Sequence, residues 1–311
     1  MAQMIKTLLL GLREELTSAN LWFKHDQPRR LLEPQWGGRS LGYVAYRIAI
    51  ALYFTIVILY DGVSYAYGWK WFIFLTDWFY ILLTFQALFL GFAVTFHYER
   101  AKRATPGESI YGSLAWPLQL IWFLQNLILS GAVLITLVYW GWAIYEEVDK
   151  KIDLPNVTAH GLITLYVLTD SFIVGIPVRL LHFYQPPILG VSYATFSWVY
   201  WMCGGTDPEG RSYVYSVLDF SSSPTVCIGY ICMLVVFSMF LHLCMFGLCK
   251  VRMIMCESTC CHVLCCMDDA QEATPPVMLT AMTAKDSLVD LVVIDSNEEP
   301  AKKSLLNVSE V

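Results

Sequence analysis

The chain has 311 residues, of which 57% are hydrophobic and only 15% are charged. Soluble domains carry about 25% charged residues, so this composition excludes an ordinary soluble protein. The net charge of -6 is unevenly distributed: the stretch before residue 43 is basic and the acidic excess lies in residues 268–311. No nucleic-acid partner is expected from this pattern.

Six apolar stretches follow one another along the chain, and we expect membrane spans at 43–60, 71–96, within 109–145, and at 157–178, 188–203 and 225–249. A crossing needs about 20 residues, so 109–145 is too long for one span. Its first part is expected at the interface, with Pro117 near the helix start. The sequence predicts an all-α fold, an integral membrane bundle of six transmembrane helices.

Basic residues fix the orientation of these spans. Sixteen of the 20 Lys and Arg residues fall on one side when the loops are assigned alternately, which places both termini in the cytoplasm. Arg47, near the start of the first span, is expected to reach the headgroups. Asn156 then lies on the outer side as a candidate glycosylation site, whereas Asn307 lies in the cytoplasm and should stay unmodified.

The predicted organisation has four parts: a cytoplasmic segment 1–42, the transmembrane domain 43–249, a Cys-rich juxtamembrane segment 250–267 and an acidic tail 268–311. Apolar residues at helical spacing before residue 17 indicate either an interfacial amphipathic helix or a short helix packed on the bundle. The tail composition favours disorder and contacts with cytoplasmic partners.

Ten cysteines are present, and most of them follow or end the last span. Cytoplasmic cysteines beside a span are typical palmitoylation sites, and the candidates are Cys256, Cys260, Cys261, Cys265 and Cys266. The alternatives are an unmodified apolar helix end and a zinc site with His262. The usual C-x2-C pairs of zinc sites are missing, so we expect no metal and no cofactor.

Ionisable residues inside spans are costly and are candidates for function. They are Asp77, His160, Asp170, Arg179 and His182. The alternative for each is a structural role, such as a bond to another helix. We find no motif of a soluble enzyme, no Arg-rich voltage-sensing helix and no filter-like sequence. A small-solute carrier remains a further alternative.

An ordered set of short motifs over about residues 20–250 resembles the rolling stone family of multi-pass membrane proteins. The motifs are Gln35-Trp36, Tyr46-Arg47, Leu75-Thr76-x-Trp78, His160-Gly161-Leu162, Pro177-Val178-Arg179, His182-Phe183, Tyr193, Phe196, Tyr200-Trp201, Gly204-Gly205, Val214-Tyr215 and Leu218-Asp219. The resemblance implies a protein of the plasma membrane, with the endoplasmic reticulum as the alternative. It also implies a role in myoblast or other cell–cell fusion, or in membrane organisation.

That family is distantly similar to the androgen-induced membrane hydrolases, which cleave fatty-acid esters of hydroxy fatty acids with an intramembrane Thr and a His. The resemblance places the nucleophile at Thr76. The H-G-x-H pattern of the hydrolases reads His160-Gly161-Leu162-Ile163 here, so Ile163 occupies the position of the catalytic His. A Thr hydroxyl needs an adjacent base. An enzyme would therefore have to use Thr76 with His160, which lies about one helical turn before Ile163. Whether the chain is an enzyme acting on a lipid ligand or a non-enzymatic membrane protein stays open.

Overall fold

The computed structural model describes residues 13–25, 27–103, 116–143 and 157–260. The chain divides into two units, Met1–Asp269 and Ala270–Val311, and the second unit lies wholly outside these ranges. Within them the regular structure is helical apart from one isolated bridge between Pro34 and Val174. The predicted all-α class is confirmed for this part of the chain.

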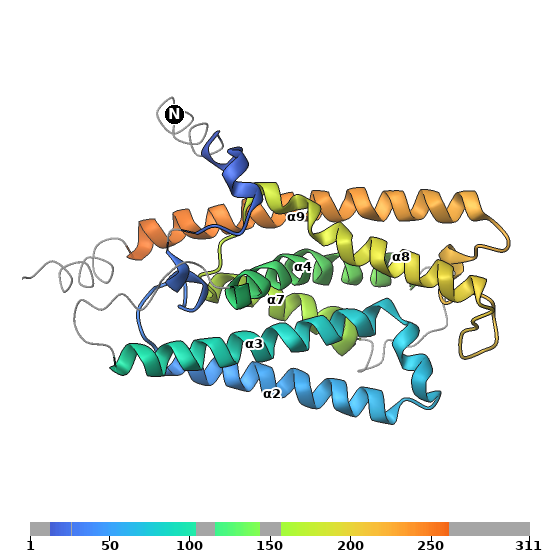
Figure 1. Cartoon of the computed structure of the whole chain (residues 1–311), viewed down its shortest axis with the longest axis horizontal. Coiled ribbons are helices and arrows are strands. Elements are labelled where there is room, and N and C mark those ends of the chain that lie inside the picture. Colours follow the sequence, from blue (N-terminus) through green and yellow to red (C-terminus); the bar gives the residue numbers. More distant parts are fainter. Residues whose placement is uncertain (1–12, 26, 104–115, 144–156, 261–311) are drawn as a thin grey trace, which may run out of the picture. The chain divides into compact units, whose positions relative to one another are not determined.

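The α-helices described are α2 (Leu41–Ser64), α3 (Leu75–Arg103), α4 (Trp116–Val138), α7 (Ile163–Ile173), α8 (Pro186–Met202) and α9 (Pro224–Cys260), as Figure 1 shows. Short 3-10 segments join or precede them: η1 (Ser18–Leu21), η2 (Pro28–Leu31), η3 (Gly68–Ile73), η6 (Leu180–Tyr184) and η7 (Ser216–Leu218). Two π-helical segments, η4 (Tyr139–Ala143) and η5 (Thr158–Leu162), follow α4 and precede α7.

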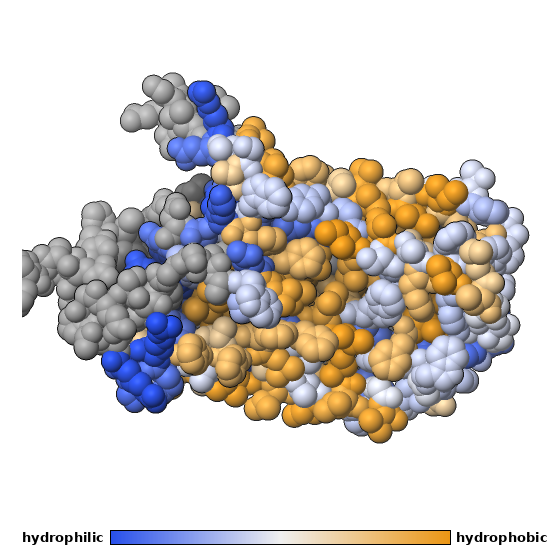
Figure 2. Space-filling model, in the orientation of Figure 1, coloured by the Kyte–Doolittle hydropathy of each residue, from blue (hydrophilic) through white to orange (hydrophobic). Residues whose placement is uncertain are grey.

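Four helices are long and apolar enough to cross a membrane: Leu41–Ser64, Leu75–Arg103, Trp116–Gly141 and Pro224–Met253. About 20 helical residues cover the roughly 30 Å of a hydrocarbon core. Their apolar side chains also face outward, since Val63 is 85% exposed and Phe92 is 73% exposed. Figure 2 shows apolar side chains gathered over the middle of the helices. Lipid suits such a surface better than water.

The helices define two ends of the bundle. At one end Ser40 caps α2 by accepting a hydrogen bond from the Tyr43 amide at 3.2 Å, and Arg39 donates to the Ala101 carbonyl in the last turn of α3 at 2.9 Å. We call this end the basic end. At the opposite end η3 joins α2 to α3, and we call it the η3 end (Figure 1).

The predicted span 157–178 is not one continuous helix. The α-helix ends at Ile173, and residues 174–179 are non-helical. A side chain at Gly175 would place its Cβ 2.6 Å from the Arg30 carbonyl oxygen, so the chain can pass this point only as glycine. Pro177 also lacks an N–H for a helical bond. The apolar composition alone suggested a helix to residue 178.

The N-terminal segment compensates for this break. Gln35 donates its amide to the Ile173 carbonyl at 2.7 Å, and Gly175 donates to the Glu33 carbonyl at 3.1 Å. Leu31 packs beneath them and is fully buried. Irregular backbone at membrane depth is tolerated where protein surrounds it. The residues before α2 therefore belong to the folded bundle.

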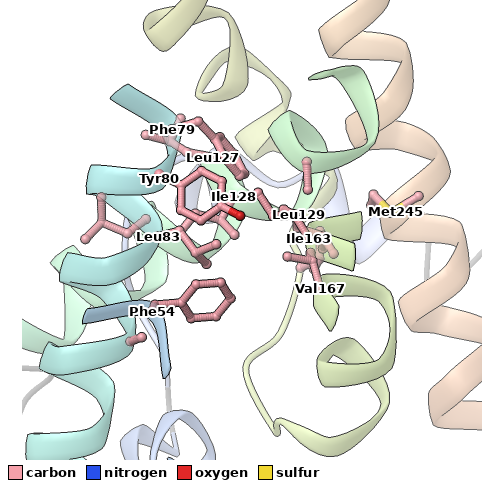
Figure 3. Packing of buried hydrophobic residues seen from close by; sticks show 14 of the residues in the cluster. Phe54, Phe79, Tyr80, Leu83, Leu127, Ile128, Leu129, Ile163, Val167 and Met245 are labelled. Atoms are coloured by element: carbon pink, nitrogen blue, oxygen red, sulfur yellow. The ribbon is translucent and has the colours of Figure 1, made fainter. Parts of the chain in front are cut away.

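α4 occupies the centre of the bundle and contacts α3, α7, α8 and α9. Figure 3 shows Ile163 and Val167 of α7 lying against Leu129 of α4, while Phe79 and Leu83 reach the same core from α3. Burying apolar groups away from lipid brings little hydrophobic gain, so close packing and interhelical hydrogen bonds have to hold these helices together.

Candidate functional site

A buried ion pair joins α2 to α7. Arg47 Nη1 lies 2.9 Å from Asp170 Oδ1, and the two side chains are 2% and 3% exposed. The Tyr46 hydroxyl donates to the same oxygen at 2.8 Å. The guanidinium also lies over the rings of Tyr43 and Tyr46, 4.9 and 5.1 Å from their centroids. Instead of reaching toward headgroups, Arg47 turns inward to the Asp170 carboxylate.

The position of Asp170 explains why it needs a cation. Asp170 lies in the last turn of α7, where the helix dipole adds partial negative charge to that of the carboxylate. A second arginine neutralises the same helix end. Arg252 of α9 is buried and donates from Nη1 to the carbonyls of Ser171 and Val174, the latter at 2.9 Å. Sequence reasoning counted Arg252 only as a cytoplasmic charge and missed this role.

A second polar cluster surrounds His182 nearer the basic end. The Asn126 side-chain amide donates to His182 Nδ1 at 3.0 Å and to Gln185 Oε1 at 2.9 Å. All three residues are completely buried. His242 of α9, also completely buried, hydrogen-bonds through Nε2 to the Arg179 carbonyl at 2.9 Å. Asn126, Gln185 and His242 were not singled out from the sequence, because only the fold brings them together around His182.

The N-terminal segment packs against this cluster. Glu15 accepts from Lys250 Nζ at 2.9 Å and lies 3.9 Å from Arg179. The Phe23 ring lies 5.0 Å from the His182 ring. Arg179, predicted as an intramembrane polar residue, thus faces the side-chain carboxylate of Glu15 in the N-terminal segment.

Thr76 lies half-buried in the first turn of α3 at the η3 end. Its neighbour is Tyr215, whose hydroxyl accepts the Leu75 amide at 3.1 Å and interacts with the Thr76 side chain. Tyr193, packed beside Tyr215, donates its hydroxyl to the Ile73 carbonyl at 2.8 Å. Tyr193 and Tyr215 therefore fix the start of α3, and Tyr215 also contacts Thr76.

His160 lies in η5, also at the η3 end. Its ring stacks on Tyr139 with centroids 3.6 Å apart and planes inclined by 10°. Its carbonyl accepts from Thr136 Oγ1 at 2.5 Å and from Trp140 Nε1 at 3.2 Å. Among the hydrogen bonds of the described residues, none joins His160 to Thr76. The catalytic pair stays a prediction, and Ile163, which takes the place of the hydrolase His, is buried in the core shown in Figure 3.

Asp77 is half-buried in the first turn of α3, where the positive end of the helix dipole favours a carboxylate. It interacts electrostatically with Asp61 at the end of α2. Asp61 in turn accepts a hydrogen bond from Trp71 Nε1 at 2.7 Å.

The remaining predicted sites lie partly outside the described residues. Cys256 and Cys260 are on the last turns of α9, whereas Cys261, Cys265, Cys266 and Asn156 fall outside. Within the residues that the structure describes, no three His, Cys, Asp or Glu side chains are placed to hold a metal ion.

Long apolar helices with outward-facing apolar side chains, joined by buried polar contacts, define a helical multi-pass membrane protein. Comparison with known families then identifies the family to which the chain belongs. The family model described as "Protein rolling stone" matches residues 2–265, so the chain belongs to the rolling stone family.

A curated relative agrees with this assignment. Protein rolling stone of Drosophila melanogaster is 28% identical over 257 residues, which cover 80% of this chain and 93% of that protein. No solved structure matches the chain.

Proposed function

We propose that this chain is a six-pass plasma-membrane protein with cytoplasmic termini that acts in cell–cell fusion, such as myoblast fusion, or in the membrane organisation that precedes it. Membership of the rolling stone family supports the process. The observation that carries a non-enzymatic role is the use made of the buried charges. Arg47 pairs with Asp170 and Arg252 binds backbone carbonyls, so both arginines join helices to one another.

The two shorter helices support the count of six crossings. α8 has 17 residues and is about 26 Å long, close to the hydrocarbon thickness. The π-helical η5 and α7 together extend about 24 Å, and the non-helical residues 174–179 lengthen this path further. These lengths suit a fourth and a fifth crossing beside the four long helices.

The distribution of charge supports the orientation. The basic end holds Arg39, the last turn of α3, Arg179 and Lys250. Figure 2 shows hydrophilic side chains gathered there. Lys70 and Arg211 lie at the η3 end. An excess of Lys and Arg favours the cytoplasmic side, so we assign the basic end to the cytoplasm.

A cell-mixing experiment tests the proposed function. Two cell populations carrying different cytoplasmic fluorophores would express the full chain on one side, on both or on neither. We expect a higher fraction of cells that contain both fluorophores when the chain is expressed. An unrelated multi-pass protein at equal surface density serves as the control, and no change in any pairing would contradict the proposal.

A chain shortened after residue 267 separates the two parts of the proposal. If the acidic tail engages cytoplasmic partners, the shortened chain should reach the surface and yet give less mixing. Equal mixing would confine the activity to the transmembrane unit.

A further inference from the structure

A membrane-facing groove lies between α2 and α3 at the η3 end, beneath η3. Its volume is about 480 Å3, within the range of about 300–1,000 Å3 that small-molecule sites occupy. The wall is almost wholly apolar, and the residues that matter below are Leu59, Gly62, Trp69, Trp71, Phe85 and Leu88. The groove is unrelated to Thr76 and to the buried ion pair.

The groove has the length of an elongated lipid. It starts under η3 and reaches Leu88, and on α3 alone its lining extends about 10 Å, from Ile81 to Leu88. One leaflet of the hydrocarbon core is about 15 Å thick. Leu59 and Phe85 on its wall are 61% and 51% exposed, so their side chains face the bilayer. A molecule entering from the bilayer fits along this path from the interface to the midplane.

The roof of the groove is held in place before any ligand arrives. Trp71 Nε1 donates to Asp61 at 2.7 Å, and Trp78 Nε1 donates to the Phe72 carbonyl at 2.8 Å. Lys70 Nζ donates to Thr206 Oγ1 at 3.1 Å and to the next carbonyl at 2.7 Å. A fixed aromatic roof reduces the ordering cost of binding.

Asp61 at the rim of the groove and the apolar wall limit which kind of molecule can bind. Asp61, which precedes Gly62 of the wall, is exposed and accepts the hydrogen bond from Trp71 Nε1. A phosphate or carboxylate headgroup placed here would meet like charge, whereas a neutral hydroxyl donor would find an acceptor. In the wall, the hydroxyl of Thr84 already donates to the Tyr80 carbonyl at 2.8 Å. The wall therefore suits a hydrocarbon without further polar groups.

We propose that this groove binds a membrane sterol, with the sterol hydroxyl at Asp61 and the ring system over Gly62 and against Trp69 and Trp71. A sterol combines a rigid apolar body with one uncharged hydroxyl, which matches the wall and the rim. A Cβ added at Gly62 would have only the Trp71 ring as a neighbour, at 3.9 Å, so the absent side chain leaves a flat surface. The proposal needs the membrane location, and it is independent of a role in fusion.

The test is photolabelling of the full chain in cells with a diazirine-bearing cholesterol analogue. We expect saturable labelling that excess cholesterol removes, with the labelled peptides between residues 58 and 88. Gly62→Leu should fill the groove and lower labelling about tenfold, the effect of roughly 1.4 kcal/mol. Gly229→Leu is the matched control, because Gly229 lies on the exposed surface of α9 with no atom near its Cβ position.

Each outcome decides the proposal. Labelling that cholesterol does not remove, or that falls equally in both glycine variants, would show ordinary boundary lipid and overturn it. Removal by a fatty acid or a phospholipid as efficient as that by cholesterol would overturn the choice of a sterol. If Gly62→Leu does not fold, two measurements on folded protein remain: the mapped peptide in the wild type, and Asp61→Ala, which should weaken competition by cholesterol more than competition by its 3-keto analogue.

Discussion

Arg47 Nη1 and Asp170 Oδ1 lie 2.9 Å apart and connect the first long helix to the short helix α7. The Tyr46 hydroxyl binds the same carboxylate from 124 residues away along the chain. Both charges are screened from solvent, so each depends on the other. Removing one partner leaves an uncompensated charge, whereas removing both does not.

Asp170→Ala should lower the free energy of unfolding by about 3–5 kcal/mol, because it leaves the Arg47 guanidinium buried without its carboxylate. The double variant Arg47→Met with Asp170→Leu should recover most of this loss. Thermal unfolding of the purified proteins in one detergent measures both. A double variant no more stable than Asp170→Ala would contradict the pairing.

Arg252→Gln should destabilise the chain by about 3 kcal/mol, because two charge-assisted hydrogen bonds to the end of α7 are lost. Arg103→Gln is the matched control, since Arg103 is 82% exposed and its ion pair with Glu99 contributes about 0–1 kcal/mol. The readout is the unfolding temperature together with proteolysis after Ile173. Equal effects of the two substitutions would count against a stabilising role of Arg252 at the end of α7.

Acid should weaken the loop at the η3 end through Asp207. Burial opposes ionisation of this carboxyl, but hydrogen bonds from the side chain and backbone of Arg211 outweigh it and lower the pKa of Asp207 below its ordinary value of 3.8. A lowered pKa gives stability above the unfolded value, and this stability is lost as the pH falls through the folded value. We expect the unfolding temperature to fall below about pH 4.

The Asp207→Asn variant isolates this effect. Hydrogen bonds from Ser222 and the neighbouring amides lower the pKa of Asp219 as well, so the wild type carries acid sensitivity from more than one group. The difference between wild type and variant should shrink as the pH falls from 5 to 3. A difference that is constant with pH would rule out Asp207.

The proposed orientation predicts which end of the chain is reached from outside. Tags at both termini should bind antibody only after permeabilisation, and Asn307 should remain unglycosylated. In a variant that lacks Asn156, glycosidase treatment should leave the mass of the chain unchanged, because Asn307 carries no glycan. A glycan at Asn307 would reverse the orientation.

We expect wild type to hydrolyse hydroxy-fatty-acid esters no faster than the uncatalysed background, because Ile163 supplies no base. Thr76→Ala should therefore leave the measured rate unchanged. The assay uses the purified full chain, with Thr95→Ala as a control in the second half of α3, where the Thr95 hydroxyl donates to the Gly91 carbonyl. Turnover in wild type that disappears with Thr76→Ala alone would establish an enzyme and refute the non-enzymatic proposal.

Apolar runs and turn residues made most helices predictable. The stretches 43–60 and 225–249 lie within α2 and α9, and α8 begins at Pro186, two residues before the expected start after Pro187. Gly175 and Pro177 are local signs that the helix ends before residue 178, but the position of the break after Ile173 also depends on the close approach of the Arg30 carbonyl to Gly175. Local composition carries no information about such distant partners.

The polar contacts show the same limit. Arg47 near a span end is equally suited to headgroups and to a buried partner, and only the fold brings Asp170 within reach. Arg252 was counted among the basic residues of the expected cytoplasmic side, yet that count treats it as solvated, whereas its guanidinium is bound to backbone carbonyls. Asp77 and Asp170 were recognisable as unusual from sequence, but their neighbours were not.

The broken end of α7 also constrains how the protein is made. Its carbonyls are bound by Gln35, which the ribosome synthesises early, and by Arg252, which it synthesises near the end of the last long apolar stretch. Until residue 252 has emerged, the middle of the chain holds polar backbone without its final partner. Maturation therefore has to wait for the last helix, and chains that stop before it should be recognised as unfinished by the cell's quality control.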